Sequence, residues 1–263
     1  MYFKISHNSN SPIICSIPHA GIKIPAEFQS DYLVSFEELH KEALDMADLY
    51  TDELYEELAS VSSYIQSNTS RLVVDIERFP NEEDEPMSSV GMSAFYTRTS
   101  KGEVLRTINE ERREELQKIY DEYHKSFTDV VTSSLTAHNT ALIVDCHSFP
   151  SVPRQYESDQ SIDRPDICLG VDAYHTPEKL VNVLRAQFEK VGYSVKINSP
   201  FAGTIVPLSF YKKENKVVSI MIEVNRSLYM DEETHKKLTT FSSTGRLISR
   251  CIIQGLNEFH YTL

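Results

Sequence analysis

Apolar and polar positions along the chain form two kinds of segment, which predict strands and helices. Short apolar runs, typical of strands buried on both faces, occupy residues 13–17, 64–65, 72–76, 141–144, 167–170, 193–197 and 217–224. Apolar residues at helical spacing occupy residues 35–59, 107–136, 177–191 and 232–256. Ser35, with Glu38 three residues later, is the predicted N-cap of the first helix, and a break is expected in the last helix near Ser242 and Ser243.

Because strands and helices alternate, the pattern predicts an α/β fold with three layers. The expected architecture is a central, twisted, mixed but mainly parallel sheet with helices on both faces. No repeat, low-complexity segment or long linker divides the chain, so residues 1–263 are predicted to form a single domain. Ligands in such sheets lie beyond the carboxyl ends of the strands, which makes the polar residues after strands the candidates for function.

Composition narrows the expected partners. The 26 Lys and Arg residues against 39 Asp and Glu residues give a formal net charge of −13 at pH 7, and no stretch concentrates the basic residues. A nucleic acid or an anionic membrane is therefore disfavoured as a partner. The four cysteines are scattered without a CxxC pair and are expected to be reduced. The first residues show no signal-peptide pattern and no apolar run approaches a membrane span, so we expect a cytoplasmic location.

Polar residues accompany three of the apolar runs. His19 follows the run at 13–17, Asp145 and His147 follow the run at 141–144, and Glu223 lies inside the run at 217–224. A carboxylate buried within an apolar strand needs a cation, a metal or a raised pKa, and each would make it usable as a general base. The alternative for Glu223 is a structural salt bridge with Arg71 or Arg226.

The two histidines at strand ends are candidate ligands of a zinc ion, although a histidine in this position is more often an ordinary loop residue. Asp48 is the candidate third ligand and Glu27 a weaker one, while Asp145 is expected to orient an imidazole without binding the metal. Zinc would make water more acidic, and the glutamate in the last strand would take its proton during attack on a carbonyl.

Arginines flank one predicted strand and a polar loop. Arg71 and Arg78 bracket residues 72–76. Each could polarise a carbonyl oxygen or bind a substrate carboxylate, and the alternative is an ordinary position on the surface. The loop at 151–164 carries Arg154 and Arg164 and is expected to cover the site and recognise anionic groups of the substrate.

Six motifs resemble the N-formylglutamate amidohydrolase family. They occur in the family's order and are SIPHAG (16–21), NTSRLVVD (68–75), DCHS (145–148), PDICLG (165–170), NSPFAG (198–203) and IEVNRSLY (222–229). Each motif alone is weak, but the six in order cover nearly the whole chain and are specific together.

The resemblance implies a fold and a metal site. The family is similar to zinc carboxypeptidases and aspartoacylases, which implies a carboxypeptidase-like α/β fold and one zinc ion held by two histidines and a carboxylate. His19 and His147 match the ligand histidines, and Glu223 matches a general base late in the chain. Asp48 matches an acidic position in the family's early helix. It is the least secure ligand, because the related peptidases take this carboxylate from an HxxE motif whose last position is Ile22 here.

The resemblance also implies substrate contacts. Arg71 resembles the arginine that stabilises the developing oxyanion, and Arg78 resembles the one that binds a substrate carboxylate. Asn198 and Arg226, within the fifth and sixth motifs, are expected to contact substrate. The family often shows Asp-x-Asn-Arg where this chain carries Glu77 in place of the Asn, and a carboxylate there would repel an anionic substrate or neutralise the neighbouring arginine.

These observations predict a zinc-dependent hydrolase of a small amide, an N-acyl amino acid that carries a carboxylate. The departure at position 77 bears on the predicted substrate, N-formylglutamate. It does not bear on the predicted reaction, amide hydrolysis. One alternative is a zinc peptidase that acts on a small or cell-wall peptide. Another is a binding domain that has kept the fold and lost the chemistry.

Overall fold

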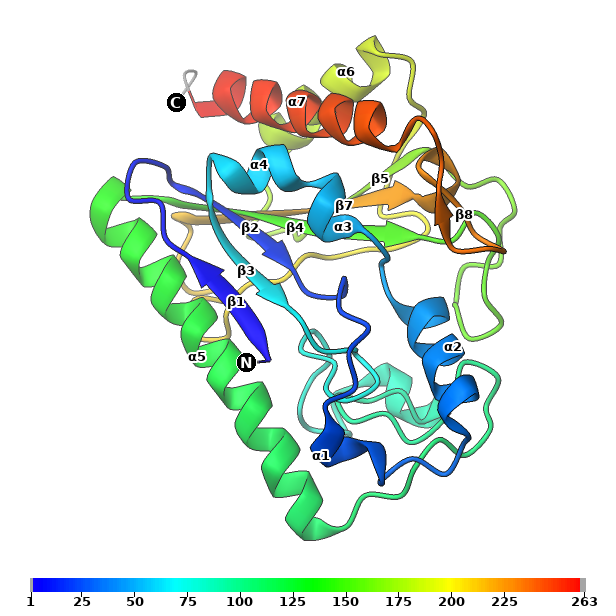
Figure 1. Cartoon of the computed structure of the whole chain (residues 1–263). Coiled ribbons are helices and arrows are strands. Elements are labelled where there is room, and N and C mark those ends of the chain that lie inside the picture. Colours follow the sequence, from blue (N-terminus) through cyan, green and yellow to red (C-terminus); the bar gives the residue numbers. More distant parts are fainter. Residues whose placement is uncertain (1, 261–263) are drawn as a thin grey trace.

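The computed structural model describes residues 2–260, and its centre is a seven-stranded sheet of order β1-β3-β2-β4-β7-β5-β6 (Figure 1). The strands are β1 (Phe3–Ser6), β2 (Ile13–Ile17), β3 (Ser63–Ser67), β4 (Ala141–Phe149), β5 (Ile167–Gly170), β6 (Val195–Ile197) and β7 (Val217–Asn225). The pairs from β3 through β2 and β4 to β7 are parallel, as is β5 with β6, whereas β1–β3 and β5–β7 are antiparallel. The prediction of a mixed, mainly parallel sheet is confirmed.

Helices cover both faces of this sheet (Figure 1). They are α1 (Ala26–Gln29), α2 (Phe36–Met46), α3 (Thr51–Leu54), α4 (Glu56–Ser60), α5 (Glu110–His138), α6 (Glu178–Lys190) and α7 (Phe241–His260), with short 3₁₀ turns η1 (Pro86–Val90) and η2 (Arg226–Leu228). Ile143 of β4 packs in the core shared with Phe127 of α5, while the next residue, Val144, packs in the core shared with Ile252 of α7. Successive strand residues point to opposite faces, so both faces of β4 are apolar and the three-layer architecture follows.

The helix predicted over residues 35–59 is interrupted. Helix α2 ends at Met46, and its capping box at Ser35 and Glu38 is as predicted. Ala47 is extended, and the N–H of Asp48 donates to the carbonyl oxygen of His19 at 2.9 Å instead of continuing the helix. The prediction that Asp48 lies in a helical turn is therefore wrong, and the interruption directs this residue to the end of β2.

The strand predicted over residues 72–76 is also absent, and this segment forms turns. Some of its carbonyl groups accept hydrogen bonds from side chains instead of from a neighbouring strand. Leu72 O accepts from the hydroxyl of Tyr32 at 3.1 Å, and Val73 O accepts from Nη2 of Arg106 at 2.8 Å. Arg106 is 1% exposed, and a buried guanidinium needs several carbonyl acceptors, which irregular backbone supplies.

Two further boundaries differ from prediction. Strand β4 does not stop at Asp145 but continues to Phe149, because it pairs with β7 along its whole length. The region predicted as helix from residue 232 begins with a small antiparallel pair, β8 (Met230–Asp231) and β9 (Lys236–Lys237). Helix α7 then runs without the expected break at Ser242 and Ser243, because these residues lie in its first turn.

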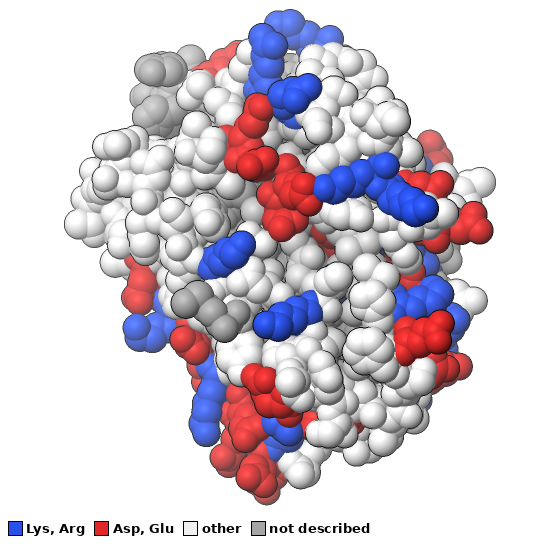
Figure 2. All heavy atoms as spheres, in the orientation of Figure 1, with Lys and Arg blue, Asp and Glu red and all other residues white. Residues whose placement is uncertain are grey.

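The surface mixes both signs of charge. On the face shown in Figure 2, basic and acidic side chains are interspersed, with acidic groups gathered toward the lower end of the view. Within residues 2–260, the longest apolar helical stretch falls short of what a membrane crossing requires.

Candidate functional site

The candidate site lies where the carboxyl ends of three parallel strands meet. Strand β4 pairs with β2 on one side and with β7 on the other, and the register places His147 directly opposite Glu223. His19 follows the end of β2 by two residues. Their side chains line one cavity of about 230 Å³, to which Arg71 also contributes. The parallel topology therefore brings together three residues that are far apart in sequence, as ligand sites in such sheets require.

Both histidines are buried and each has one nitrogen held by a carboxylate. His19 Nε2 lies 2.9 Å from Asp75 Oδ1, and His147 Nε2 lies 3.1 Å from Asp145 Oδ1. Each imidazole is 3% exposed, and the two ring centroids are 5.1 Å apart. The expectation that Asp145 orients an imidazole agrees with this contact, and Asp75 does the same for the other ring.

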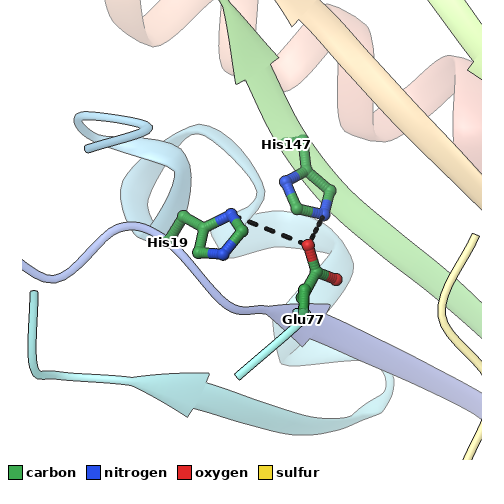
Figure 3. Close-up of side chains that lie close together, drawn as sticks. All are labelled: His19, Glu77 and His147. Carbon is green, nitrogen blue, oxygen red and sulfur yellow. Dashed lines mark ion pairs between the residues drawn. The ribbon is translucent and has the colours of Figure 1, made fainter. Parts of the chain in front are cut away.

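Two further carboxylates face the pair of imidazoles. Asp48 Oδ2 lies 3.0 Å from Nδ1 of His147 and 3.8 Å from Nδ1 of His19. Glu77 Oε2 lies 3.2 Å from Nε2 of His147 and 3.7 Å from Nδ1 of His19 (Figure 3). The other oxygens differ, because Asp48 Oδ1 accepts from Nη2 of Arg226 at 2.9 Å whereas Glu77 Oε1 is buried without a hydrogen-bond partner among the described residues.

The buried carboxylates of the cluster favour positive charge beside them. Burial lowers the pKa of His147, but the carboxylates of Glu77 and Asp145 outweigh burial and hold that pKa well above its usual range. The same imidazole outweighs burial at Glu77 and lowers its pKa to about 2. At Asp145, burial and the neighbouring Glu77 raise the pKa to about 6. The buried carboxylates thus favour positive charge on the imidazoles, a role that a divalent cation would fill when the histidines bind it as neutral ligands.

The donor set suits a zinc ion. Imidazole nitrogens with one carboxylate are the ligands of many catalytic zinc sites, and outer carboxylates commonly fix the ring orientation. Among the described residues, His19, Glu77 and His147 offer ligand atoms that all lie within 4.8 Å of one another. The residues present therefore fit a single metal ion.

Among residues 2–260, no ion pair involves Glu223. It is 6% exposed, and its Oε2 has no hydrogen-bond partner among the described residues. Burial raises its pKa to about 8, against an opposing influence from His147. The two arginines considered as its salt-bridge partners are engaged elsewhere: Arg71 pairs with Asp75 at 2.7 Å, and Arg226 pairs with Asp48 at 2.9 Å. A buried carboxyl with a free oxygen in a cavity is an arrangement typical of a general base.

Asp75 joins the metal-binding side of the cavity to the arginine side. Its Oδ1 contacts His19, while its Oδ2 accepts from Nε and Nη2 of Arg71 at 2.9 and 2.7 Å and from the hydroxyl of Tyr96 at 2.9 Å. Burial alone would raise the pKa of Asp75, but Arg71 and His19 hold it well below its usual range. The carboxylate therefore fixes one imidazole and one guanidinium relative to each other.

Arg78 also lines the cavity and has unused donors. Its Nε lies 3.6 Å from Asp75 Oδ2, and its Nη1 lies 3.6 Å from Glu85 Oε1. Both separations are longer than a hydrogen bond, and Nε is buried without a hydrogen-bond partner among the described residues. This guanidinium is therefore placed to receive a carboxylate.

Other predicted site residues lie outside the cavity lining. Glu27 is exposed on α1, where it accepts from the hydroxyl of Tyr2. Asn198 holds a turn through an acceptor contact with the N–H of Val171 at 2.8 Å. Arg154 lies in the loop at 151–164 without lining the cavity.

Two residues of this loop do close over the site. Tyr156 and Glu157 line the cavity, and Glu157 forms an ion pair with Arg164, whose Nη1 also donates to Pro150 O at 2.9 Å. Arg164 therefore anchors the loop, and its guanidinium lies against the rings of Phe149 and Phe201. The expectation that the loop covers the site agrees with this arrangement.

The sequence is similar to proteins of one family. A sequence model described as N-formylglutamate amidohydrolase matches residues 11–230. An N-formylglutamate deformylase of Pseudomonas aeruginosa is 27% identical over 237 residues, covering 84% of this chain and 83% of that protein. An N-formylglutamate deformylase of Pseudomonas putida is 25% identical over 236 residues, covering 86% of this chain and 84% of that protein.

Solved structures share the fold. A crystal structure of N-formylglutamate amidohydrolase from Ralstonia eutropha JMP134 superposes with a TM-score of 0.82 at 20% identity, covering 100% of this chain and 99% of that one. A gene product from Agrobacterium tumefaciens superposes with a TM-score of 0.69 at 17% identity, covering 98% of this chain and 96% of that one.

Proposed function

The chain belongs to the N-formylglutamate amidohydrolase family, and on this premise we propose that it hydrolyses the amide bond of a small N-acyl amino acid with one zinc ion. One observation carries the proposal. Glu223, a buried carboxyl with a free oxygen, shares a cavity with two imidazoles whose nitrogens face the same carboxylates. A general base beside a metal site is the arrangement that amide hydrolysis by activated water requires.

We assign His19, His147 and Asp48 as the metal ligands. Each of them has a charged partner behind it: Asp75 at Nε2 of His19, Asp145 at Nε2 of His147, and Arg226 at Oδ1 of Asp48. Outer partners of this kind orient ligands and set their protonation, and on this ground we assign both Nδ1 atoms and Oδ2 to the metal, although the ligand atoms that lie within 4.8 Å of one another are those of His19, Glu77 and His147.

Glu77 is the competing third ligand. It has no such partner on Oε1, and binding through it would direct the metal to the nitrogen of His147 that faces Asp145. The role of Arg226 in this assignment is to position Asp48 instead of binding substrate.

Zinc in this position would polarise the scissile carbonyl and make water more acidic. Glu223 takes the proton of the attacking water and passes it to the leaving amine. Arg71, fixed by Asp75 through Nε and Nη2, donates to the carbonyl oxygen as that oxygen gains negative charge. Arg78 binds the carboxylate of the substrate, and its buried Nε gains the acceptor that it lacks.

The reaction is tested by assaying protein purified without added zinc against N-formyl, N-acetyl and N-succinyl amino acids. We expect about one zinc per chain, because one three-residue ligand set is present, and release of a free amino acid from at least one substrate. Hydrolysis of a peptide with none of these compounds cleaved would instead favour the peptidase. Bound zinc without turnover of any amide would favour a binding domain.

The third ligand is tested with two matched substitutions. Asp48→Asn is expected to lower zinc affinity by at least about tenfold, since even an outer partner of a ligand contributes tenfold to a hundredfold. Glu77→Gln, which removes the other carboxylate facing both histidines, is expected to leave the zinc content unchanged. The measurement is metal content after dialysis against a chelator of graded concentration. Loss of zinc from Glu77→Gln with retention in Asp48→Asn would assign the third ligand to Glu77.

A further inference from the structure

A second cavity adjoins the catalytic one. Its volume is about 300 Å³, and it shares Glu77, Arg78, Ala202 and Met221 with the cavity that contains the histidines. The shared guanidinium of Arg78 is the group assigned to the substrate carboxylate. A substituent next to that carboxylate therefore has this second cavity, which we call the side chamber, directly beside it.

The side chamber is mostly apolar. Its apolar lining residues are Ile76, Phe79, Ile205, Val206, Leu208 and Met221. Phe79 is 48% exposed and Leu208 is 54% exposed, so two large apolar side chains of the chamber lining are in contact with solvent. When an apolar group covers such a wall, the free energy of binding becomes more favourable by roughly 25 cal/mol for each Å² of apolar surface removed from water.

The charges of the side chamber oppose a second carboxylate. Its ionisable lining includes the two acids Glu77 and Asp145, the base Arg78, and His124. Burial lowers the pKa of His124, whose Nε2 lies 2.8 Å from Ile76 O. The guanidinium of Arg78 already lies 3.6 Å from Asp75 Oδ2 and 3.6 Å from Glu85 Oε1, and N-formylglutamate would bring two more carboxylates to it. Each anion left without a cation costs binding energy.

We propose that the side chamber receives an apolar side chain, so that the preferred substrates are N-acyl derivatives of apolar amino acids of the size of leucine or methionine rather than N-formylglutamate. This inference rests on the proposed function, because it takes Arg78 as the site of the substrate carboxylate. It gives the replacement of the family's Asn by Glu77 a consequence: a carboxylate in the lining shared by the two cavities disfavours an acidic side chain and tolerates an apolar one.

The test compares kcat/KM for N-formyl-L-leucine, N-formylglycine and N-formyl-L-glutamate. Burial of a leucine side chain is expected to favour the leucine compound over the glycine compound by roughly tenfold to a hundredfold. The glutamate compound is expected to fall below glycine. Equal or faster hydrolysis of N-formyl-L-glutamate than of N-formyl-L-leucine would overturn the proposal.

Binding separates this inference from the reaction itself. Calorimetric titration of the zinc-loaded Glu223→Gln variant with the same three compounds is expected to give the same order of affinity. If the affinities follow this order but the natural chain hydrolyses none of the compounds, the proposed reaction is contradicted and the role of the side chamber is supported. Tightest binding of the glutamate compound would contradict the chamber whatever the turnover.

A charge added to the chamber lining supplies a second test. Leu208→Arg gives the chamber a second cation. It is expected to raise the ratio of kcat/KM for the glutamate compound to kcat/KM for the leucine compound by about tenfold or more, because the new guanidinium forms one favourable charge interaction with the glutamate side chain. Leu33→Arg makes the same substitution at a position that is 65% exposed and lines neither cavity, and it is expected to leave the ratio unchanged. A Leu208→Arg protein with an unchanged ratio would show that the substrate side chain lies elsewhere.

Discussion

Replacing Glu223 with Gln is expected to lower kcat for amide hydrolysis by about a hundredfold to ten-thousandfold, the range that a positioned general base contributes. Gln has nearly the same shape but cannot accept the proton of the attacking water. The variant should fold, because it removes an ionisable group whose pKa burial raises to about 8 and whose Oε2 has no partner among the described residues. Its zinc content should be unchanged, since Glu223 is not an assigned ligand.

Steady-state kinetics with metal analysis on the same samples check this expectation. Glu57→Gln, the same substitution at an exposed position of α4, serves as the matched control and should retain full activity. A rise in KM alone would indicate a binding role for Glu223, and full turnover by a correctly folded Glu223→Gln protein would contradict the mechanism.

Zinc added to metal-free protein is expected to raise the melting temperature by roughly 5–10 °C at a free concentration a hundred times the dissociation constant. This follows from about 2.7 kcal/mol of linkage free energy and about 2–4 °C per kcal/mol for a chain of this size. The physical reason lies in the cluster itself, where Asp48 and Glu77 face the two imidazoles within 3.8 Å. Asp48 also pairs with Arg226, but without a metal Glu77 depends on protonation of the buried histidines for nearby positive charge, whereas zinc supplies that charge directly.

Scanning calorimetry across a zinc titration measures the shift, with magnesium as the control ion because it prefers an octahedral oxygen set. His147→Ala should abolish the shift, whereas His40→Ala, at an exposed position of α2, should keep it. A metal-free protein whose melting temperature does not respond to zinc would contradict the metal assignment, and with it the proposed route of amide hydrolysis.

The chain pattern by itself determined the layers of the fold. The buried strands β2, β4, β5 and β7 and the helices α5 and α6 were predicted because their signal is local: continuous apolar runs or helical spacing within one segment. His19, His147 and Glu223 could be selected because each accompanies such a run, and parallel strands place their carboxyl ends together. The motif order led to the amidohydrolase family, which the sequence comparison shows.

Only the tertiary structure decided which carboxylates approach the histidines. Asp48 contacts His147 across 99 positions of sequence, because α2 ends early and the backbone N–H of Asp48 donates to His19 O, two residues after β2. Asp75 lies within the segment 72–76 that pattern analysis assigned to a strand, and Glu77 follows it directly. This segment forms turns, and Arg106 donates a hydrogen bond to Val73 O that periodicity does not record.

The physical reason is the range of the interactions involved. Apolar burial follows the period of the local backbone and is therefore readable along the chain, whereas a buried charge is placed by the partners that satisfy it. Those partners lie on other elements: Asp75 is 56 positions from His19, and Arg226 is 178 positions from Asp48. The sequence alone therefore determined that two histidines and a glutamate accompany buried strands, and the folded chain determined that four carboxylates and three arginines complete the site around them.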